Sequence, residues 1–471
     1  MTTVATEDVQ AAVSSGIWQP EQRRLTTGLV LIVSLTAFEA LAVATALPVA
    51  IGDIGGVRFY GWAFSGFMLA NLVGIQAAGE SADQHGAERP FATGCALFVA
   101  GLLIAGLAPG ILVFLAGRVL QGFGAGAISA ATYVAVARAY ANSARPRMLA
   151  VLASAWVVPG MIGPAAAGVL THLFGWRSVF LSLLPLVAAA LLLAAPPLRS
   201  LAAAHGEQEP ATRTGPAARL ALGTGLVLWA FDALPALHAW ILFAVGAALA
   251  VPGFRRLLPS GVARARPGLP AAVAALGVMS AAFFGAEAYV PLLLTAVRGQ
   301  PMLVAGAALT AATLCWTSGT WVQERLVHRL TRRTLGCVGL LMIIAGVAGV
   351  SALLSAAVPV GLAPVMWGIA GAGMGVAYPT AMLVALESAP RGHEGEYSAA
   401  MQLANVLGVA LGTGVGGGLL ALATSAGYST ALGIGAADAF ALVIGFLGLA
   451  AAARLPRVAG VEHRTAPSAA A

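Results

Sequence analysis

Charged side chains are rare in this sequence, and a few of them stand inside long apolar runs. Glu39 lies in the run 26–51, Glu287 lies in the run 269–296, and Asp438 lies in the last run of the chain. Runs of this length suit an α-helix that crosses a bilayer core of about 30 Å, where an ionised carboxylate costs roughly 2.5–3.5 kcal/mol. Burial generally raises the pKa of a carboxylic acid, so an acid kept at this cost can bind and release a proton near neutral pH. It can also attract a cationic ligand.

The composition predicts an integral membrane protein. Of the 471 residues, 59% are hydrophobic and 9% are charged, and the mean hydropathy is +0.89. Soluble domains carry about 25% charged residues, so this chain has too few polar side chains to cover itself in water. The three cysteines and seven histidines are scattered, without the spacing of a disulfide framework or a metal site. We therefore expect no metal, no cofactor and no enzymatic active site.

Apolar runs separated by short polar breaks predict 14 membrane-spanning helices, grouped as six, two and six. The runs lie at 26–51, 59–79, 91–108, 110–137, 149–172, 178–195, 218–234, 236–252, 269–296, 302–323, 334–355, 358–387, 396–423 and 427–453. The expected divisions are a tail at 1–25, a six-helix bundle at 26–195, a linker at 196–217, an inserted helix pair at 218–252, a basic loop at 253–268, a second bundle at 269–453 and a tail at 454–471. Twelve spans, without the middle pair, is the alternative.

The arginines predict the orientation of these spans. All 25 basic residues are arginine. If the N-terminus is cytoplasmic, 21 of them fall in cytoplasmic segments, three fall in outer loops and Arg118 falls within a span. This is the positive-inside distribution, so the arginines are topology signals rather than a nucleic-acid-binding face. Both termini are then cytoplasmic. The all-arginine usage is typical of a high-GC bacterial genome and favours the bacterial inner (plasma) membrane.

The two blocks of six resemble each other at a nearly constant offset. Three pairs match: 121–134 with 370–383, 162–170 with 411–419, and Glu39 with Glu287. Their offsets are 249, 249 and 248 residues. A duplication that relates two six-helix halves is typical of secondary transporters, whose substrate sites lie near the bilayer midplane between the halves.

The break between the second and third runs reads GESADQHGAERP. Gly79, Asp83, Gly86 and Arg89 match the cytoplasmic loop motif of the major facilitator superfamily, which this stretch resembles, although its basic cluster is reduced. In such a loop, glycines let helices approach closely and an aspartate can pair with an arginine to latch an inner gate. A plain polar turn is the alternative. The equivalent break of the second half is residues 319–333, where Gly319, Arg325 and Arg329 form a degenerate echo of this motif.

The fourth run contains FLAGRVLQGFGAG. Through Arg118 and Gln121 it resembles another pattern of the same superfamily. An arginine inside a span must face protein or water and find a partner. In proton-coupled members this arginine is thought to respond to the protonation of an acidic residue, and a purely structural ion pair is the alternative.

The fifth run contains PGMIGPAAAG. Gly163, Pro164 and Gly168 resemble the superfamily's antiporter motif, which is associated with export in exchange for protons. Two positions of the motif depart from the pattern. These residues are expected to bend the helix and to allow a close contact between the halves. Many drug–proton antiporters also carry an acid in the first helix before an Ala-Leu-Pro tripeptide, and that tripeptide ends here at Pro48, after Glu39.

Several polar and aromatic residues are expected to share the central cavity from their helix positions, although packing is the alternative for each. They are Asn71, Gln76, Tyr133, Trp156, Tyr289, Trp367, Tyr378, Gln402 and Asn405.

The resemblance to the major facilitator superfamily extends over almost the whole chain and is strongest to its 14-span drug:proton antiporter branch. It implies two six-helix bundles in a pseudo-twofold arrangement, with two extra helices between them. It also implies proton-coupled export of drug-like or amphipathic small molecules by a monomer, driven by the proton gradient. The expected partners are substrate, protons and the lipid bilayer. A symporter or uniporter for a metabolite or lipid-like molecule is the alternative, and a membrane enzyme or a non-transporting sensor is further removed.

Overall fold

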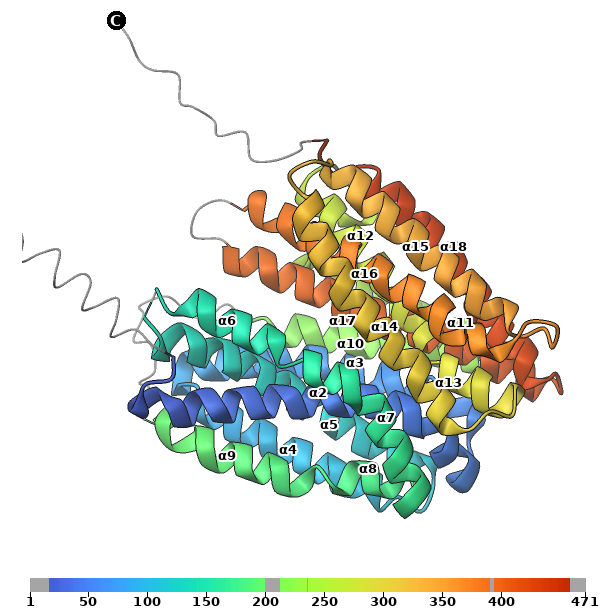
Figure 1. Ribbon diagram of the computed structural model, residues 1–471, viewed down its shortest axis with the longest axis horizontal. Coiled ribbons are helices and arrows are strands. Elements are labelled where there is room, and N and C mark those ends of the chain that lie inside the picture. The colour runs from blue at the N-terminus through green and yellow to red at the C-terminus, as the bar shows by residue number, and fades with distance from the viewer. Residues whose placement is uncertain (1–16, 142, 200–211, 235, 390–393, 458–471) are drawn as a thin grey trace, which may run out of the picture.

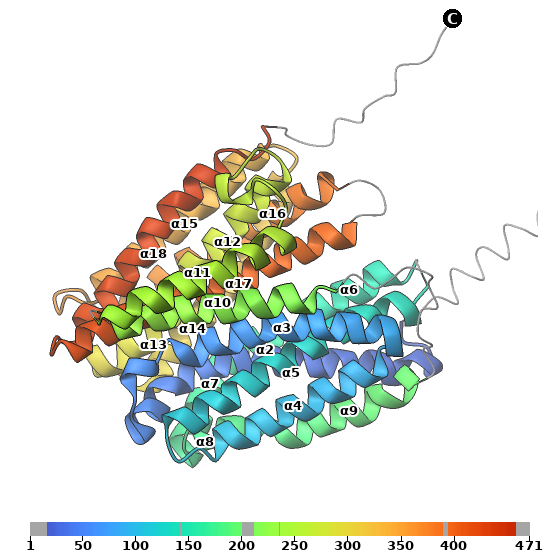
Figure 2. The ribbon, with the colours of Figure 1, turned by 180° about the vertical axis from the view of Figure 1, so that it is seen from behind.

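The computed structural model describes residues 17–457 except 142, 200–211, 235 and 390–393. Every regular element in the described part of the chain is helical (Figures 1 and 2). Parts of the expected tails at 1–25 and 454–471 and of the linker at 196–217 lie outside the described residues. The all-α fold expected from the apolar runs is confirmed.

The helices fall into a first half, a middle pair and a second half, in chain order. The first half comprises α2 (Pro20–Ile54), η1 (Val57–Phe59), α3 (Trp62–His85), α4 (Glu88–Gly106), α5 (Ile111–Ala139), α6 (Arg145–Ser154), α7 (Val157–Phe174), α8 (Arg177–Leu181) and α9 (Leu184–Arg199). The middle pair is α10 (Thr214–Ala233) and α11 (Leu237–Leu257), followed by η2 (Val262–Arg264). The second half comprises α12 (Leu269–Glu287), α13 (Val290–Leu292), the π-helix η3 (Leu293–Val297), α14 (Met302–Leu326), α15 (Arg332–Ala352), η4 (Val360–Leu362), α16 (Ala363–Glu387), α17 (Glu394–Ser425) and α18 (Thr430–Ala452).

Proline and glycine determine where several of these helices begin, end or break. Proline occupies the first turn of α2, α12 and α16, where its missing N–H would have no helical partner. Gly86 ends α3 with a φ of 84°, a conformation that side-chain-bearing residues rarely adopt. Pro291 cannot donate to the carbonyl of Glu287, which is four residues earlier, and α12 ends at Glu287.

Twelve helical segments of the described chain are long and apolar enough to cross a membrane. The first half supplies five, the middle pair supplies α11 and the second half supplies six. The helices α3 and α10 are not among them. Asn71, Gln76 and Glu80 lower the mean hydropathy of α3, while Arg219 and Asp232 lower that of α10. This set differs from both sequence expectations, because the twelve-span alternative omitted the middle pair and kept α3. The 14 crossings remain a prediction.

The internal repeat is visible in the contacts between helices. Gly122 of α5 lies so close to the Phe67 carbonyl of α3 that a Cβ would collide with it. Gly371 of α16 has the same contact with the carbonyl of Ala312 in α14. Such close approach of backbones is what small residues allow in membrane helices.

Further glycine contacts extend this match along the same helices. Gly126 faces the Asn71 carbonyl, while its counterpart 249 residues later faces the Trp316 carbonyl. Gly74 and Gly319 likewise face residues 123 and 372. The offset is therefore 249 between α5 and α16, and 245 between α3 and α14. The loop-motif match expected at Gly319 is therefore corrected. Gly319 corresponds to Gly74 and not to Gly79 of the motif, because Gly74 and Gly319 make the same packing contact.

The two halves meet tightly at one end of the molecule. The Tyr60 hydroxyl of the first half donates to the Ala288 carbonyl of the second at 3.0 Å, and within the second half the Tyr289 hydroxyl donates to the Thr413 carbonyl at 2.6 Å. Both tyrosines are fully buried and their ring centroids lie 5.5 Å apart. Gly61 allows this contact, since a Cβ there would lie 2.6 Å from the Thr413 carbonyl oxygen.

Toward the other end the two halves diverge, on the side of α6 and the start of α17 (Figures 1 and 2). A small cavity separates α3 from α17 there, between residues 72–76 and 399–406. The same two helices are in contact elsewhere, as are α7 and α14. The molecule is therefore closed at the end of Tyr60 and open at the opposite end.

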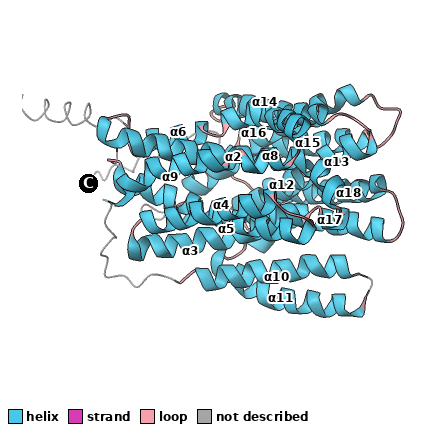
Figure 3. Cartoon of the chain, turned by 90° about the horizontal axis from the view of Figure 1, so that it is seen from below, coloured by secondary structure: helices cyan, strands magenta, loops and turns pink. Residues whose placement is uncertain are grey.

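The middle pair lies along one flank of the bundle (Figure 3). α10 packs on α3 of the first half and on α17 of the second, whereas α11 packs mainly on α10. Gly223 and Gly246 allow α10 and α11 to touch at backbone distance. α11 exposes Leu237, Trp240 and Ile241, as expected for a face that meets lipid.

Gly61→Leu should open the closed end, because the added side chain collides with the backbone of α17. In a protein whose three native cysteines are replaced by alanine, Ala288→Cys places a single thiol at this contact. We expect this thiol to react with a bulky maleimide about ten-fold faster when Gly61→Leu is also present, because overpacking costs about 1–3 kcal/mol. The matched control is Gly52→Leu, because a Cβ at Gly52 meets no atom within 4 Å. Equal rates in both variants would contradict the role given to Gly61.

Candidate functional site

A buried charged cluster lies between α2, α3 and α5. Glu39, Arg118 and Gln121 are each at most 2% exposed. The Arg118 guanidinium pairs with Glu39 Oε1 and donates to Gln121 Oε1 at 2.8 Å. Its Nε donates to the Ala63 carbonyl at 3.0 Å, and its Cζ lies 4.4 Å from the centroid of the Phe67 ring. The sequence prediction that Arg118 needs a partner inside the protein is thus met by four groups from three helices.

Helix geometry and small residues position this cluster. Arg118 and Gln121 are three residues apart and therefore share one face of α5. Gly117 and Gly122 flank them, with Gly117 against α4 and Gly122 against α3. The backbones can then approach closely enough for the short reach from Arg118 to the Ala63 carbonyl.

The cluster leaves hydrogen-bonding capacity unused. Among the described residues, Glu39 Oε2 and Gln121 Nε2 have no hydrogen-bond partner although both atoms are buried. Most buried polar atoms are satisfied in folded proteins, so such exceptions call for an explanation. One free acceptor and one free donor beside an ion pair can bind a proton, a water molecule or a polar group of a ligand.

The second half repeats the acid but not the arginine. Glu287, the counterpart of Glu39, is 8% exposed at the end of α12, and its Oε2 has no partner among the described residues. The counterpart of Arg118 at the 249-residue offset is Trp367, which is fully buried and whose Nε1 also lacks a partner in the described structure. Phe283, one turn before Glu287, stacks on Trp367 at 5.0 Å. The two halves therefore differ in charge at matched positions.

Asp438 belongs to a different place in the fold. It is 3% exposed in α18 and accepts a hydrogen bond from the Ser351 hydroxyl of α15 at 2.9 Å. Both helices belong to the second half, and among the described residues Asp438 forms no ion pair. The structure does not bring it into the Glu39 cluster.

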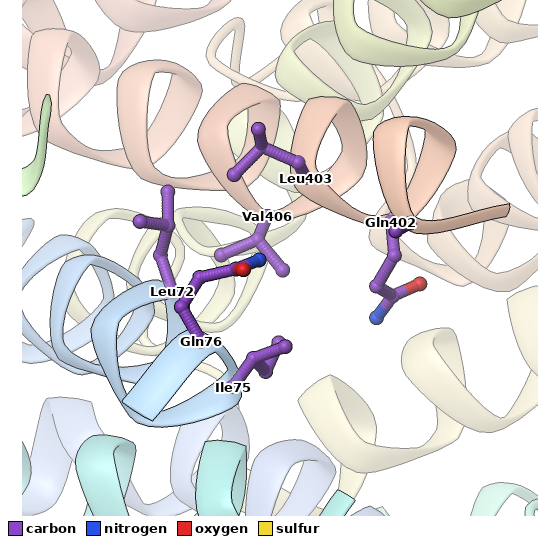
Figure 4. A pocket seen from close by; sticks show the side chains of 7 residues that line it. Leu72, Ile75, Gln76, Gln402, Leu403 and Val406 are labelled. Carbon is purple, nitrogen blue, oxygen red and sulfur yellow. The ribbon is translucent and has the colours of Figure 1, made fainter. Parts of the chain in front are cut away.

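The expected cavity residues separate into three groups. Gln76 and Gln402 line the cavity between α3 and α17, where Gln76 points toward Leu403 and Val406 (Figure 4). Tyr133 and Trp156 are 62% and 49% exposed in the first half.

The remaining members of that set pack within the protein. Tyr289 and Trp367 are fully buried, and this corrects their expected place on an open cavity, since aromatic rings fill the contacts around α12 instead. Tyr378 packs on Trp316 at 5.8 Å. Asn405 accepts from Ser280 at 2.8 Å, and Asn71 donates to the Gly122 carbonyl at 3.4 Å.

The non-helical turn within the loop motif is shorter than expected from the sequence. α3 continues to His85, so Gly79 and Asp83 lie in the helix and the turn itself is Gly86 with the residue after it. Asp83 pairs with Arg138 at the end of α5, with 3.5 Å between the charged atoms. Arg89 is exposed in α4.

The same stretch contains an acid whose contacts the sequence pattern did not predict. Glu80 accepts hydrogen bonds from the Arg213 amide, from the Thr214 amide at 2.7 Å and from the Thr214 hydroxyl at 2.7 Å, and so anchors the start of α10. At the other end of α10, Trp62 donates to Asp232 at 2.5 Å. No spacing in the sequence links these residues, because the linker between α9 and α10 separates them.

The antiporter-like motif lies where the two halves touch. The Pro164 carbonyl faces Gly306 of α14, where an added Cβ would lie 2.9 Å away. A Cβ added at Gly168 would lie 3.8 Å from Leu303 of the same helix, and one added at Gly163 would lie 3.5 Å from Phe38 of α2. The close contact between halves that was expected at this motif is present.

Comparison with curated proteins identifies relatives among multidrug transporters. The chain is 33% identical over 172 residues to the Multidrug resistance protein B homolog of Mycobacterium tuberculosis, across 36% of this chain and 32% of that protein. It is 26% identical over 167 residues to the Multidrug transporter protein MdtP of Bacillus subtilis, across 36% of this chain and 31% of that protein. The matched stretch thus spans about a third of the length of these relatives.

Solved structures share the fold over nearly the whole chain. A peptide transporter, POT, superposes with a TM-score of 0.66 at 16% identity, covering 91% of this chain and 94% of that one. A bacterial homolog of the human lysosomal transporter Spinster, in an inward-facing and occupied conformation, gives 0.63 at 14% identity, with 92% and 96% covered. At these identities the likeness concerns the fold alone.

The sequence pattern of one family extends from residue 29 in α2, through the middle pair, to residue 413 in α17. The contacts that repeat between α3–α5 and α14–α16 agree with this match. The chain belongs to the Major Facilitator Superfamily.

Proposed function

We propose that this transporter exports drug-like or amphipathic small molecules in exchange for protons. The observation that carries the proposal is the buried cluster of Glu39, Arg118 and Gln121, which holds an ion pair beside an unused acceptor and an unused donor. The multidrug transporters among its relatives support the substrate class. The proton gradient supplies the energy.

Protonation of Glu39 would change the balance of forces between α2 and α5. It removes the negative charge from a buried pair, and leaving one partner of such a pair uncompensated costs about 3–5 kcal/mol. Arg118 keeps Gln121, the Ala63 carbonyl and the face of the Phe67 ring as partners. The guanidinium then turns toward α3 and α5, and α2 is released to move.

α2 connects this change to the second half of the protein. It contacts α7 within its own half and α13 and α14 across the interface. Where the Pro164 carbonyl lies against Gly306, no side chain stands between the backbones of α7 and α14. Backbones in direct contact transmit a small displacement without absorbing it in side-chain rotation. Alternating access by rocking of the two halves then follows from the charge state of Glu39.

Glu287 is suited to exchange a proton for a cationic substrate. Its carboxyl group lacks a counter-charge among the described residues, so in the ionised state it is stabilised by whichever cation reaches it. A proton and a cationic substrate compete for the same oxygen atoms. Antiport requires at least that the proton and the substrate cannot occupy this carboxylate at the same time.

We further propose that all 14 long helices cross the inner membrane of a bacterium, with both termini in the cytoplasm and the monomer as the working unit. α3 and α10 have 24 and 20 residues, and at 1.5 Å per residue they reach about 36 and 30 Å, which is enough to span the bilayer core. The polar groups of α10 are partnered by α3 at both ends, through Glu80 and through Trp62. The open end of the molecule then faces the cytoplasm.

Glu39→Gln should abolish the coupling of substrate transport to proton transport, because the glutamine side chain cannot carry the exchangeable proton. We expect ΔpH-driven uptake of substrate into everted vesicles to fall about a hundred-fold, and unfolding to become easier by about 3–5 kcal/mol as Arg118 loses its counter-charge. The double variant with Arg118→Gln removes the orphaned charge, so it should regain stability but not coupling.

The matched control is Asp53→Asn on the same helix, where the native acid forms an exposed ion pair with Arg177 at 2.7 Å. That variant should transport normally. If the Glu39→Gln protein transports with an unchanged pH dependence, the coupling role of Glu39 is wrong. Normal pH-independent transport by both proteins would favour a uniporter.

Glu287→Gln should weaken the binding of a cationic substrate, because the carboxylate is then absent. We expect the affinity of purified protein for tetraphenylphosphonium at pH 8 to fall about ten-fold or more. The parent protein should bind this cation more weakly toward pH 5, and the variant should lack that decrease. Asp438→Asn is the control, because its acid is also buried in the second half but is hydrogen-bonded to Ser351. Equal losses in the two variants would show that Glu287 has no special part in binding cations.

A further inference from the structure

A second cavity lies at the open end, on the flank where the middle pair joins the two halves. Its volume is about 220 Å³, and its walls come from α3, the start of α10, the end of α11, the start of α12 and the first turns of α17. The polar lining consists of Arg213, Arg256, Tyr397 and Gln76. The remaining lining is apolar, with leucines, alanines and one proline. None of the described residues that line it is acidic.

Both arginines of this cavity lack a side-chain partner among the described residues. In the described structure neither guanidinium forms an ion pair or a hydrogen bond, while five other arginines are paired with acids. Glu80 lies nearby, but its oxygens already accept from the Arg213 amide and from Thr214. Two unpaired guanidinium groups on one cavity favour an anion, and their planar forks match phosphate oxygens.

Backbone groups at the cavity add to this preference. α12 begins at Leu269, which lines the cavity, and no side chain caps its first turn. The free amide groups and the dipole at this helix start favour negative charge. The Tyr397 hydroxyl and the Gln76 amide can also donate hydrogen bonds to an anion.

The position of the cavity points to a lipid rather than to a free ion. Arg256 stands in the last turn of α11, a 21-residue apolar helix whose outer face is exposed. A basic residue at the end of such a helix lies at the level of lipid headgroups. The apolar wall of Leu257, Leu258 and Leu403 offers a surface for the glycerol and upper acyl chain of an amphiphile, which a free phosphate does not need.

We propose that this cavity binds the phosphate headgroup of an anionic phospholipid from the leaflet at the open end. Arg213 and Arg256 hold the phosphate, and the leucine wall holds the adjoining apolar part of the lipid. Because α3 belongs to the first half while α12 and α17 belong to the second, the bound lipid touches both halves and the middle pair. A ligand that fits this arrangement stabilises the conformation that is open at this end.

The test measures lipid binding to purified protein in detergent, by native mass spectrometry and by thermal unfolding with dioleoylphosphatidylglycerol added. The variants are Arg213→Gln, Arg256→Gln and the double variant. Basic residues near anionic lipid contribute about 1 kcal/mol each, so each single change should weaken binding about five-fold and the double change about 25-fold. Arg256→Lys, which keeps the charge, should retain most of the affinity.

Arg255→Gln is the matched control, because Arg255 is exposed in the same helical turn but does not line the cavity. It should bind lipid as the parent protein does. Dioleoylphosphatidylcholine, which carries the phosphate but no net charge, should stabilise the protein less than phosphatidylglycerol.

Three results would overturn the proposal. The first is an equal loss of affinity in Arg255→Gln, which would mean general surface attraction. The second is an arginine-dependent stabilisation by inorganic phosphate as large as that by the lipid, which would make the ligand a free anion. The third is unchanged lipid binding in the double variant. None of these measurements depends on transport, so their outcome is separate from that of the proposed antiport.

Discussion

The buried guanidinium of Arg118 is the constraint around which the first half is arranged. Arginine cannot lose its proton inside a protein, so its charge must be compensated wherever the fold puts it. Here the partners are a carboxylate on α2, a carbonyl on α3, and an amide on α5 itself. Each is reachable because glycines on either side of Arg118 bring α3 and α4 to backbone distance. A side chain at Gly122 would displace α3 and take the Ala63 carbonyl away from the guanidinium.

The second half has the same backbone packing as the first half but lacks a counterpart of the buried Arg118. The glycine contacts of α14 and α16 repeat those of α3 and α5, so the helices approach equally closely. At the position of Arg118 the second half has Trp367, which stacks on Phe283 and fills the space with rings. Aromatic stacking stabilises packing but supplies no counter-charge, and one oxygen atom of Glu287 has no partner among the described residues. One backbone frame thus holds a paired acid in one half and an unpaired acid in the other.

Much of the fold could be predicted from the sequence because apolar length and glycine spacing are local properties. The apolar runs gave the helices, and the match between 121–134 and 370–383 gave the true register of α5 and α16. The pairing of Arg118 with a buried acid could be predicted as well, since a charge within a membrane span requires a partner. The contacts of Glu80 could not be predicted, because its partners follow a linker of arbitrary length. Tyr289 was placed on the cavity wrongly, since sequence alone does not tell an aromatic ring that closes a helix contact from one that faces an open space.

The middle pair is held by hydrogen bonds to the first half and by close apolar contacts with glycines of the second half. α10 is tied to the first half by polar contacts at both ends, through Glu80 and Asp232. Toward the second half it presents Leu228 and Phe231 to Gly414 and Gly418 of α17, a smooth apolar contact without hydrogen bonds among the described residues. A contact of apolar side chains with glycines can slide at little cost, whereas directed hydrogen bonds cannot. When the halves rock, the pair should therefore move with the first half, and the cavity between α10, α11 and α17 should change shape with each cycle.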